Sequence, residues 1–183
     1  MAQEALVIGA SGMLTEVARW LAKEGYQVTV VGRDRQKLAR VRDGTGNPGA
    51  FQLLALDYGH TEALRTAMTE LVARRGAIDL VVSWIHTTAQ EALPVIMTEL
   101  SRSERPFELY HVCGSRAWKT PPVVHVPATC AYRRVILGFV CEDEQSRWLT
   151  NREIADGVIQ AIRQKAAQAI VGQVEPWERR PSY

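Results

Sequence analysis

The feature that most constrains this chain is a regular alternation of short apolar runs with longer segments of helical periodicity. Runs of this kind suit strands that are buried on both faces, and helices between them make the connections of a parallel sheet. We expect strands over residues 5–9, 27–32, 51–57, 78–84, 107–114 and 133–140. We expect helices over residues 12–25, 33–44, 60–76, 88–103 and 149–172. The alternation predicts an α/β fold in one domain, residues 1–183, with a doubly wound, mostly parallel sheet of about six strands and helices on both faces.

Local signals refine two of the expected helices and the C-terminus. Pro94 lies inside a helical segment, so we expect it in the first turn or at a kink. Thr150 or Asn151 is the expected N-cap of the last helix, with Glu153 placed to complete a capping box. Residues 174–183 are expected to form a weakly ordered tail.

Composition excludes several classes of protein. The 22 Lys and Arg residues and the 20 Asp and Glu residues give a net charge of +2, and no window concentrates the basic ones. A nucleic-acid or membrane surface is therefore not expected. The N-terminus lacks a basic segment followed by a long apolar one, and no run approaches the ~20 apolar residues of a membrane span, so a cytoplasmic location is expected. The three cysteines lack the spacing of a zinc or redox motif, and no metal site is expected.

The segment ALVIGASGML near the N-terminus places an apolar strand directly before a glycine turn and a helix. Gly9, Gly12 and Thr15 hold the three positions of a G-x-x-G-x-x-G pattern, with threonine in the last. Glycines at such a turn let a pyrophosphate approach the N-terminus of a helix, where unpaired N–H groups and the helix dipole favour an anion. The alternative is a strand-to-helix turn without a ligand, which would also use glycine. We expect a dinucleotide to contact five residues of the turn: Gly9, Ser11, Gly12, Met13 and Leu14.

Arg33 follows the second expected strand, about 20 residues after the glycine turn, where this type of fold contacts the adenosine ribose. A carboxylate there usually holds a free 2′-hydroxyl. A guanidinium suits a 2′-phosphate better, because it can form bidentate, charge-assisted hydrogen bonds. Arg33 therefore favours NADP(H) as the cofactor. Arg35 and Lys37 either add to the positive field or lie on a solvated helix face.

Over almost all of its length the chain resembles a short-chain dehydrogenase/reductase. VIGASGML resembles the glycine turn of that family, VGRDRQKL its phosphate-selecting site, ALDY its adenine-binding aspartate, and DLVVSWIH the strand end with the family's Asn-Asn-Ala-Gly. LYHVCGS resembles the strand that ends in the catalytic serine, and VILGFV the strand that leads into the Pro-Gly motif. The resemblance implies a Rossmann fold and adenine contacts from Asp57 and Tyr58. It also implies a nicotinamide half beside Ser83, Trp84 and the next two residues, with Ser115 as the catalytic serine.

The chain departs from that family at the catalytic pair, Tyr-x-x-x-Lys. In the family the tyrosine is the general acid, and the lysine lowers its pKa and holds the ribose. None of the five tyrosines here has a lysine four residues later. Residues 116–131, which separate Ser115 from the next expected strand, contain three prolines and leave no room for a long helix. We therefore expect the catalytic helix to be absent.

Three residues are candidates for proton transfer or substrate orientation in place of that pair: His86, Ser115 and Tyr132. His86 lies just beyond the fourth expected strand, in the crevice where doubly wound sheets bind ligands, and histidine titrates near neutral pH. The alternative for His86 is a hydrogen-bonded structural histidine. His125 and Tyr132 fall in or near the shortened connection and are weaker candidates to face the nicotinamide, whereas His111 lies within an apolar strand and is expected to be structural.

These patterns leave two main functions open. The first is an NADP(H)-dependent oxidoreductase that transfers a hydride to a small carbonyl or imine substrate. The second is a non-catalytic NADP(H)-binding sensor or regulatory protein that keeps the cofactor half of the fold. A cofactor-free interaction module is the third class, and it would require the glycine turn, Arg33 and Asp57 to coincide by chance. The sequence is also compatible with a homodimer formed through a helix or the sheet edge.

Overall fold

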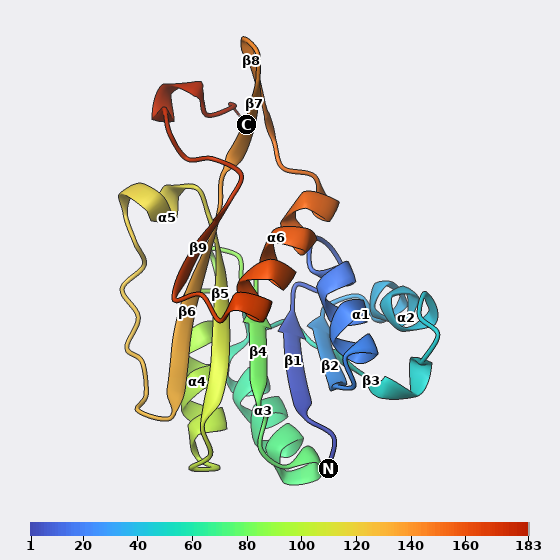
Figure 1. Cartoon of the computed structure of the whole chain (residues 1–183). Coiled ribbons are helices and arrows are strands. Elements are labelled where there is room, and N and C mark those ends of the chain that lie inside the picture. Colours follow the sequence, from blue (N-terminus) through green and yellow to red (C-terminus); the bar gives the residue numbers. More distant parts are fainter. Residues whose placement is uncertain (183) are drawn as a thin grey trace.

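The computed structural model describes residues 1–182 and contains a seven-stranded parallel sheet (Figure 1). Its strands are β1 (Glu4–Ile8), β2 (Gln27–Gly32), β3 (Phe51–Ala55), β4 (Leu80–Ser83), β5 (Phe107–Gly114), β6 (Cys130–Leu137) and β9 (Gln168–Val171). Their spatial order is β3-β2-β1-β4-β5-β6-β9, so the order reverses between β1 and β4. The doubly wound α/β architecture expected from the alternating pattern is thereby confirmed.

Helices cover both faces of the sheet. They are α1 (Thr15–Lys23), α2 (Arg35–Asp43), α3 (Thr61–Arg75), α4 (Ala92–Ser101), α5 (Arg116–Lys119) and α6 (Asn151–Gln164), with short 3₁₀ turns at Pro48–Ala50 and Trp177–Arg179. In β1, Ala5 and Val7 pack with the core under α1, α2 and α6, while Leu6 and Ile8 pack with the core under α3 and α4. Burial on both faces explains why the strand sequences are continuously apolar.

The structure bears out two details of the expected helices. Pro94 is the third residue of α4, in the first turn, where its missing N–H breaks no helical hydrogen bond. Thr150 is the N-cap of α6. Its hydroxyl accepts from the Glu153 N–H at 3.2 Å, and the Glu153 carboxylate accepts from the Thr150 N–H at 2.9 Å. These two bonds form the predicted capping box.

The last helix ends earlier than expected. The sequence favours a helix over residues 149–172, but α6 stops at Gln164 because Lys165 adopts a left-handed conformation, with φ at 50°. The chain then turns back and forms β9, which pairs with β6 in parallel. The short apolar run of β9 resembles the end of an amphipathic helix, and periodicity alone does not separate the two structures.

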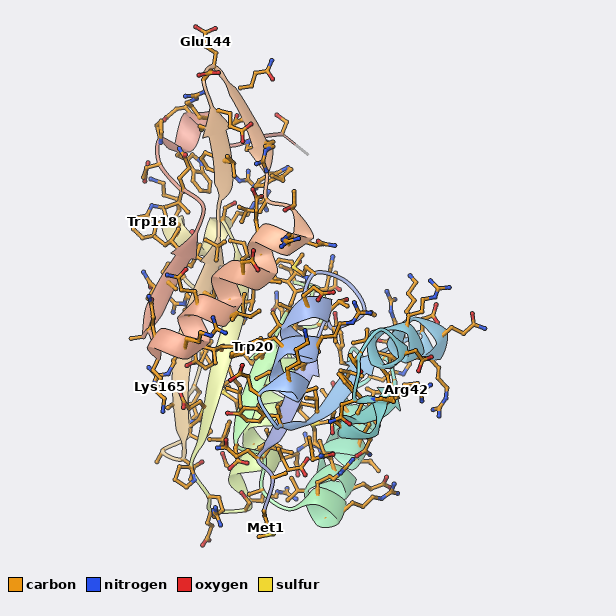
Figure 2. All side chains as sticks on the ribbon, turned by 45° about the vertical axis from the view of Figure 1, so that its right-hand side comes forward. Met1, Trp20, Arg42, Trp118, Glu144 and Lys165 are labelled. Atoms are coloured by element: carbon orange, nitrogen blue, oxygen red, sulfur yellow. The ribbon has the colours of Figure 1, made fainter. Side chains whose placement is uncertain are left out.

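The connections around β5 and β6 differ most from a regular β-α-β unit. The chain between those strands contains only the four-residue α5, followed by residues 120–129 without a helix or strand. After β6, an antiparallel hairpin of β7 (Phe139–Glu142) and β8 (Gln145–Trp148) projects beyond the carboxyl edge of the sheet (Figure 1). Figure 2 shows Glu144 at the tip of this hairpin, at the opposite end of the molecule from Met1.

The C-terminal segment folds back against the hairpin and α5. Gln173 exchanges two backbone hydrogen bonds of 2.9 Å with Phe139, and Glu175 accepts from the Trp118 indole at 2.9 Å and from Lys119 at 3.1 Å. Residues 174–182 of the expected weakly ordered tail therefore have a defined place, while Tyr183 lies outside the described residues. Within the described part of the chain, no helix is long and apolar enough to cross a membrane.

Candidate functional site

The glycine turn follows β1 at the carboxyl edge of the sheet. Gly9 has φ at 96°, a conformation that L residues with a side chain rarely adopt. A Cβ at this position would also lie 3.0 Å from the Cβ of Trp84, the residue after β4. Glycine is therefore required at position 9 for two reasons: the backbone conformation there and the close approach of the neighbouring strand end.

The rest of the turn has room for an anion. A Cβ on Gly12 would meet nothing closer than the Gly9 carbonyl oxygen, at 4.0 Å, so the protein itself does not need glycine there. Among residues 1–182, the N–H groups of Ser11 and Met13 have no hydrogen-bond acceptor. The Thr15 hydroxyl lies 2.5 Å from the Ala10 carbonyl oxygen and 2.8 Å from that of Gly12, and thereby fixes the turn from inside. Unpaired N–H groups just before a helix suit a phosphate.

An open cleft of about 490 Å³ lies over the ends of β2, β3 and β4. It is lined by Arg33, Asp57, Tyr58, Gly59, His60, His86, Thr88 and Ala89. The glycine turn contributes no lining residue, but the Ser11 hydroxyl lies 3.5 Å from the position of a Cβ on Gly32, the residue before Arg33. Asp34 does not neutralise Arg33, because its carboxylate caps α2 by accepting from the N–H groups of Gln36 and Lys37 at 2.9 and 3.1 Å. In the part of the chain that the structure describes, the Arg33 side chain makes no ion pair or hydrogen bond. An exposed guanidinium without a partner in a cleft is suited to an anionic ligand.

The wall opposite Arg33 comes from the ends of β3 and β4. Asp57 accepts from the Gly59 N–H at 2.9 Å, and its other carboxylate oxygen lies 3.8 Å from His60 Nε2. The Tyr58 hydroxyl accepts from the His86 N–H at 3.3 Å and so ties the two strand ends together. Asp57 and Tyr58 thus lie in the same cleft as Arg33, as the proposed adenosine site requires.

His86 belongs to this cleft. Its Nδ1 accepts from the Thr88 N–H at 3.3 Å and lies 2.9 Å from the Thr88 hydroxyl, so in the neutral ring the proton is on Nε2. The structure brings His86 together with Arg33 and Asp57. Ser115 lines neither this cleft nor the adjoining hollow at the start of α4.

Ser83 and Trp84, at the end of β4, do not line the cleft. Ser83, the last residue of β4, is fully buried, and among the described residues its hydroxyl has no partner. Trp84 is half-buried. Its Cβ lies against Gly9, and its Cη2 would be 3.9 Å from a Cβ on Gly114, at the end of β5. The indole therefore runs along the carboxyl edge from β1 to β5 and forms a wall there.

Ser115 lies beyond that wall and is covered by the C-terminal segment. Its side chain is only 3% exposed, and its hydroxyl accepts from Arg180 Nε at 2.8 Å. The Arg180 guanidinium lies 5.0 Å from the ring centre of Trp148, at the end of β8, and 5.2 Å from that of Trp177. Sequence analysis assigned no role to these three residues, because Trp148, at the end of β8, and Trp177 and Arg180, in the C-terminal segment, come together only through tertiary packing.

Tyr132 lies away from the carboxyl edge. It is the third residue of β6, on the sheet face that packs with α3 and α4, and its hydroxyl lies 2.7 Å from His111 Nδ1. Burial of the imidazole, assisted by the charge of Arg134, lowers the pKa of His111 to about 4. Burial also raises the pKa of Tyr132. His111 is accordingly a neutral partner within the sheet, as its apolar strand predicted.

A protein-family model matches part of the chain. Residues 3–92 match the family model described as short chain dehydrogenase, which includes the glycine turn, Arg33 and Asp57 but not Ser115. No curated protein sequence matches the chain.

Three solved structures have similar folds. A variant of actinorhodin polyketide ketoreductase, solved with NADPH, has a TM-score of 0.71 at 16% identity over 94% of this chain and 97% of that chain. The β-ketoacyl-[ACP] reductase FabG from Bacteroides thetaiotaomicron has a TM-score of 0.71 at 17% identity over 94% and 98%. Ribose-5-phosphate isomerase from Brucella melitensis 16M has a TM-score of 0.72 at 17% identity over 94% and 92%. Two reductases and an isomerase share this fold, so the fold alone does not define the reaction.

The low pKa of His111 predicts acid sensitivity. The unfolded chain takes up a proton at this histidine near pH 6.5, whereas the folded protein does so only near pH 4. The contribution of His111 to the free energy of unfolding is therefore fully present above pH 6.5. It falls by up to about 3 kcal/mol as the pH drops to 4. Urea unfolding across this pH range should show that His111→Gln loses less unfolding free energy than the unmodified protein, because glutamine does not titrate. The same dependence of unfolding free energy on pH in both proteins would contradict the low pKa assigned to His111.

Proposed function

We propose that the protein is an NADP(H)-dependent oxidoreductase of atypical short-chain dehydrogenase type that acts on a small carbonyl or imine substrate. The observation that carries the proposal is Arg33, an unpaired guanidinium in the same cleft as Asp57, next to a glycine turn with free N–H groups. A carboxylate and a guanidinium in one cleft can contact an adenine and a ribose phosphate together. The family match over residues 3–92 covers all of these positions.

The residues present fit such a cofactor in its adenosine half. The Ser11 and Met13 N–H groups would hold the pyrophosphate, and the space beside Gly12 would admit it. Arg33 would pair with the 2′-phosphate, and Asp57 would accept from the adenine amino group. The reduced nicotinamide, when bound, supplies a hydride to the substrate.

Ser115 is the proposed substrate-orienting residue. Its hydroxyl accepts from Arg180 Nε in this structure, and once that contact is released its single proton can be donated to a substrate oxygen. His86 is assigned to cofactor binding instead, because it lines the cleft with Arg33 and its Nδ1 is held by Thr88. Tyr132 receives no role in the reaction, because it lies within β6 and is bonded to His111.

A second candidate function is a non-catalytic NADP(H)-binding sensor. The burial of Ser115 under Arg180 favours it, because a substrate cannot reach that hydroxyl while the contact persists. The short connection after β5 supports it too, since α5 ends after four residues. Tight NADPH binding without NADPH consumption, across a broad panel of carbonyls and imines, would select the sensor.

Cofactor preference tests the assignment of Arg33. We expect calorimetric titration to show NADPH binding at least about tenfold tighter than NADH, a difference of about 1.4 kcal/mol, because the guanidinium pairs with the 2′-phosphate. Arg33→Ala should abolish the preference, whereas Arg152→Ala, an exposed arginine on α6, should retain it. Equal affinity of the unmodified protein for both cofactors would refute the phosphate assignment.

Substitution at the glycine turn separates binding from folding. Gly12→Val should abolish stabilisation by NADPH while the melting temperature without cofactor stays nearly unchanged, because the new side chain fills only the space reserved for the pyrophosphate. Gly46→Val is the matched control, since a Cβ at this exposed loop glycine also meets nothing within 4 Å. A Gly12→Val protein that NADPH still stabilises as fully as the control would make the turn purely structural.

A further inference from the structure

The open cleft serves only one half of a dinucleotide. In doubly wound sheets a dinucleotide lies across the point where the strand order reverses, with one mononucleotide half on each side. Here the reversal lies between β1 and β4. Arg33 and Asp57, which line the cleft, follow β2 and β3, on the β1 side of the reversal. The loop after β4 bends back to this side, where His86 lines the same cleft and its N–H donates to the Tyr58 hydroxyl at 3.3 Å. The other half of a dinucleotide would lie over the carboxyl ends of β4, β5 and β6.

Two of the protein's own side chains occupy this second half. Trp84 runs along the edge from Gly9 toward Gly114, at the end of β5. Beyond it, Ser115 is buried and bonded to Arg180. The position that would contact the reacting end of a dinucleotide is therefore occupied by the C-terminal segment.

Several contacts fix this segment in place. Glu175 holds it to α5 through the Trp118 indole, and Arg179 donates to the Asp143 carbonyl oxygen at 2.6 Å at the turn of the β7–β8 hairpin. Figure 1 shows the segment rising beside that hairpin. Arg180 connects it to Ser115, and the carbon of its guanidinium lies 5.0 Å from the ring centre of Trp148 and 5.2 Å from that of Trp177. A guanidinium held by two aromatic rings keeps its fork in one orientation, which directs Nε at the serine.

We propose that Arg180 is a latch that closes the second half-site, so that the latched protein binds a ribose-phosphorylated adenosine nucleotide and gains nothing from the nicotinamide half. The inference rests on the proposed function, because it assumes that the cleft at Arg33 binds the adenosine end. The open cleft can nevertheless bind a broader class of ligands than NADP(H), namely any nucleotide with an adenosine and a ribose phosphate. Opening the latch exposes Ser115 and admits the second half.

The test compares two ligands that share the adenosine half, NADPH and adenosine 2′,5′-bisphosphate, by calorimetric titration of the full chain. In the unmodified protein their affinities should agree within about fivefold, because the nicotinamide half has no contact. Arg180→Ala should strengthen NADPH binding about tenfold while leaving bisphosphate binding unchanged, because only NADPH reaches the opened half. Arg152→Ala, an exposed arginine on α6 outside the C-terminal segment, is the charge-matched control and should behave as the unmodified protein, because it leaves the contact of Arg180 with Ser115 in place.

The outcomes separate the two proposals. If neither ligand binds, the proposed function fails, and the latch fails with it. If both bind but the unmodified protein prefers NADPH by more than about fivefold, the half-site is open and the latch is wrong while the cofactor assignment stands. An unchanged affinity ratio in a folded Arg180→Ala protein also overturns the latch. Ser115→Ala, a smaller change that removes the acceptor, gives the same comparison if Arg180→Ala does not fold.

Discussion

The reversal of strand order between β1 and β4 is the constraint on which the rest of this structure depends. Because every strand of the main sheet is parallel, all the strand ends that carry the site residues meet at one edge. At the reversal the backbone of Gly9 lies against Trp84, and the close packing there demands glycine. The glycine turn and the tryptophan wall are thus two sides of one contact, and this contact divides the edge into two halves.

The two halves are built differently. On the side of β2 and β3, Arg33 has no ion pair within the described chain, and Asp57 faces an open cleft. On the side of β5 and β6, the serine at the strand end is buried beneath the C-terminal segment. Under the proposed function the open half binds a nucleotide, while in the closed half Ser115 is bonded to the protein's own Arg180. This asymmetry is the reason why the reductase and sensor functions both remain compatible with the same cleft.

The sequence predicted the parts of the structure that depend on local patterns. Buried parallel strands give continuous apolar runs, and the capping box at Thr150 and the first-turn position of Pro94 follow from backbone hydrogen bonding. The prediction failed at β9, where the left-handed Lys165 ends α6 inside a segment that still had helical periodicity. One residue's conformation decided that boundary, and composition does not reveal it.

Candidate site residues could be predicted only where each one lies at or shortly after the end of an expected strand. Arg33 and Asp57 follow strand ends and line the same cleft, and Gly12 lies in the turn after β1, where its lack of a side chain leaves space. His86 was expected beside the nicotinamide but is held by Thr88 next to Arg33, because the loop after β4 turns toward β3. The contact of Arg180 with Ser115 joins residues 65 positions apart, and tertiary packing alone creates it.

The most direct test of this account is a crystal structure with adenosine 2′,5′-bisphosphate, solved at a resolution that places each phosphate. The account predicts the 2′-phosphate within hydrogen-bond distance of Arg33, the 5′-phosphate at the N–H groups of Ser11 and Met13, and Arg180 still bonded to Ser115. A nucleotide bound away from the glycine turn, or with its 2′-phosphate turned from Arg33 into solvent, would contradict it.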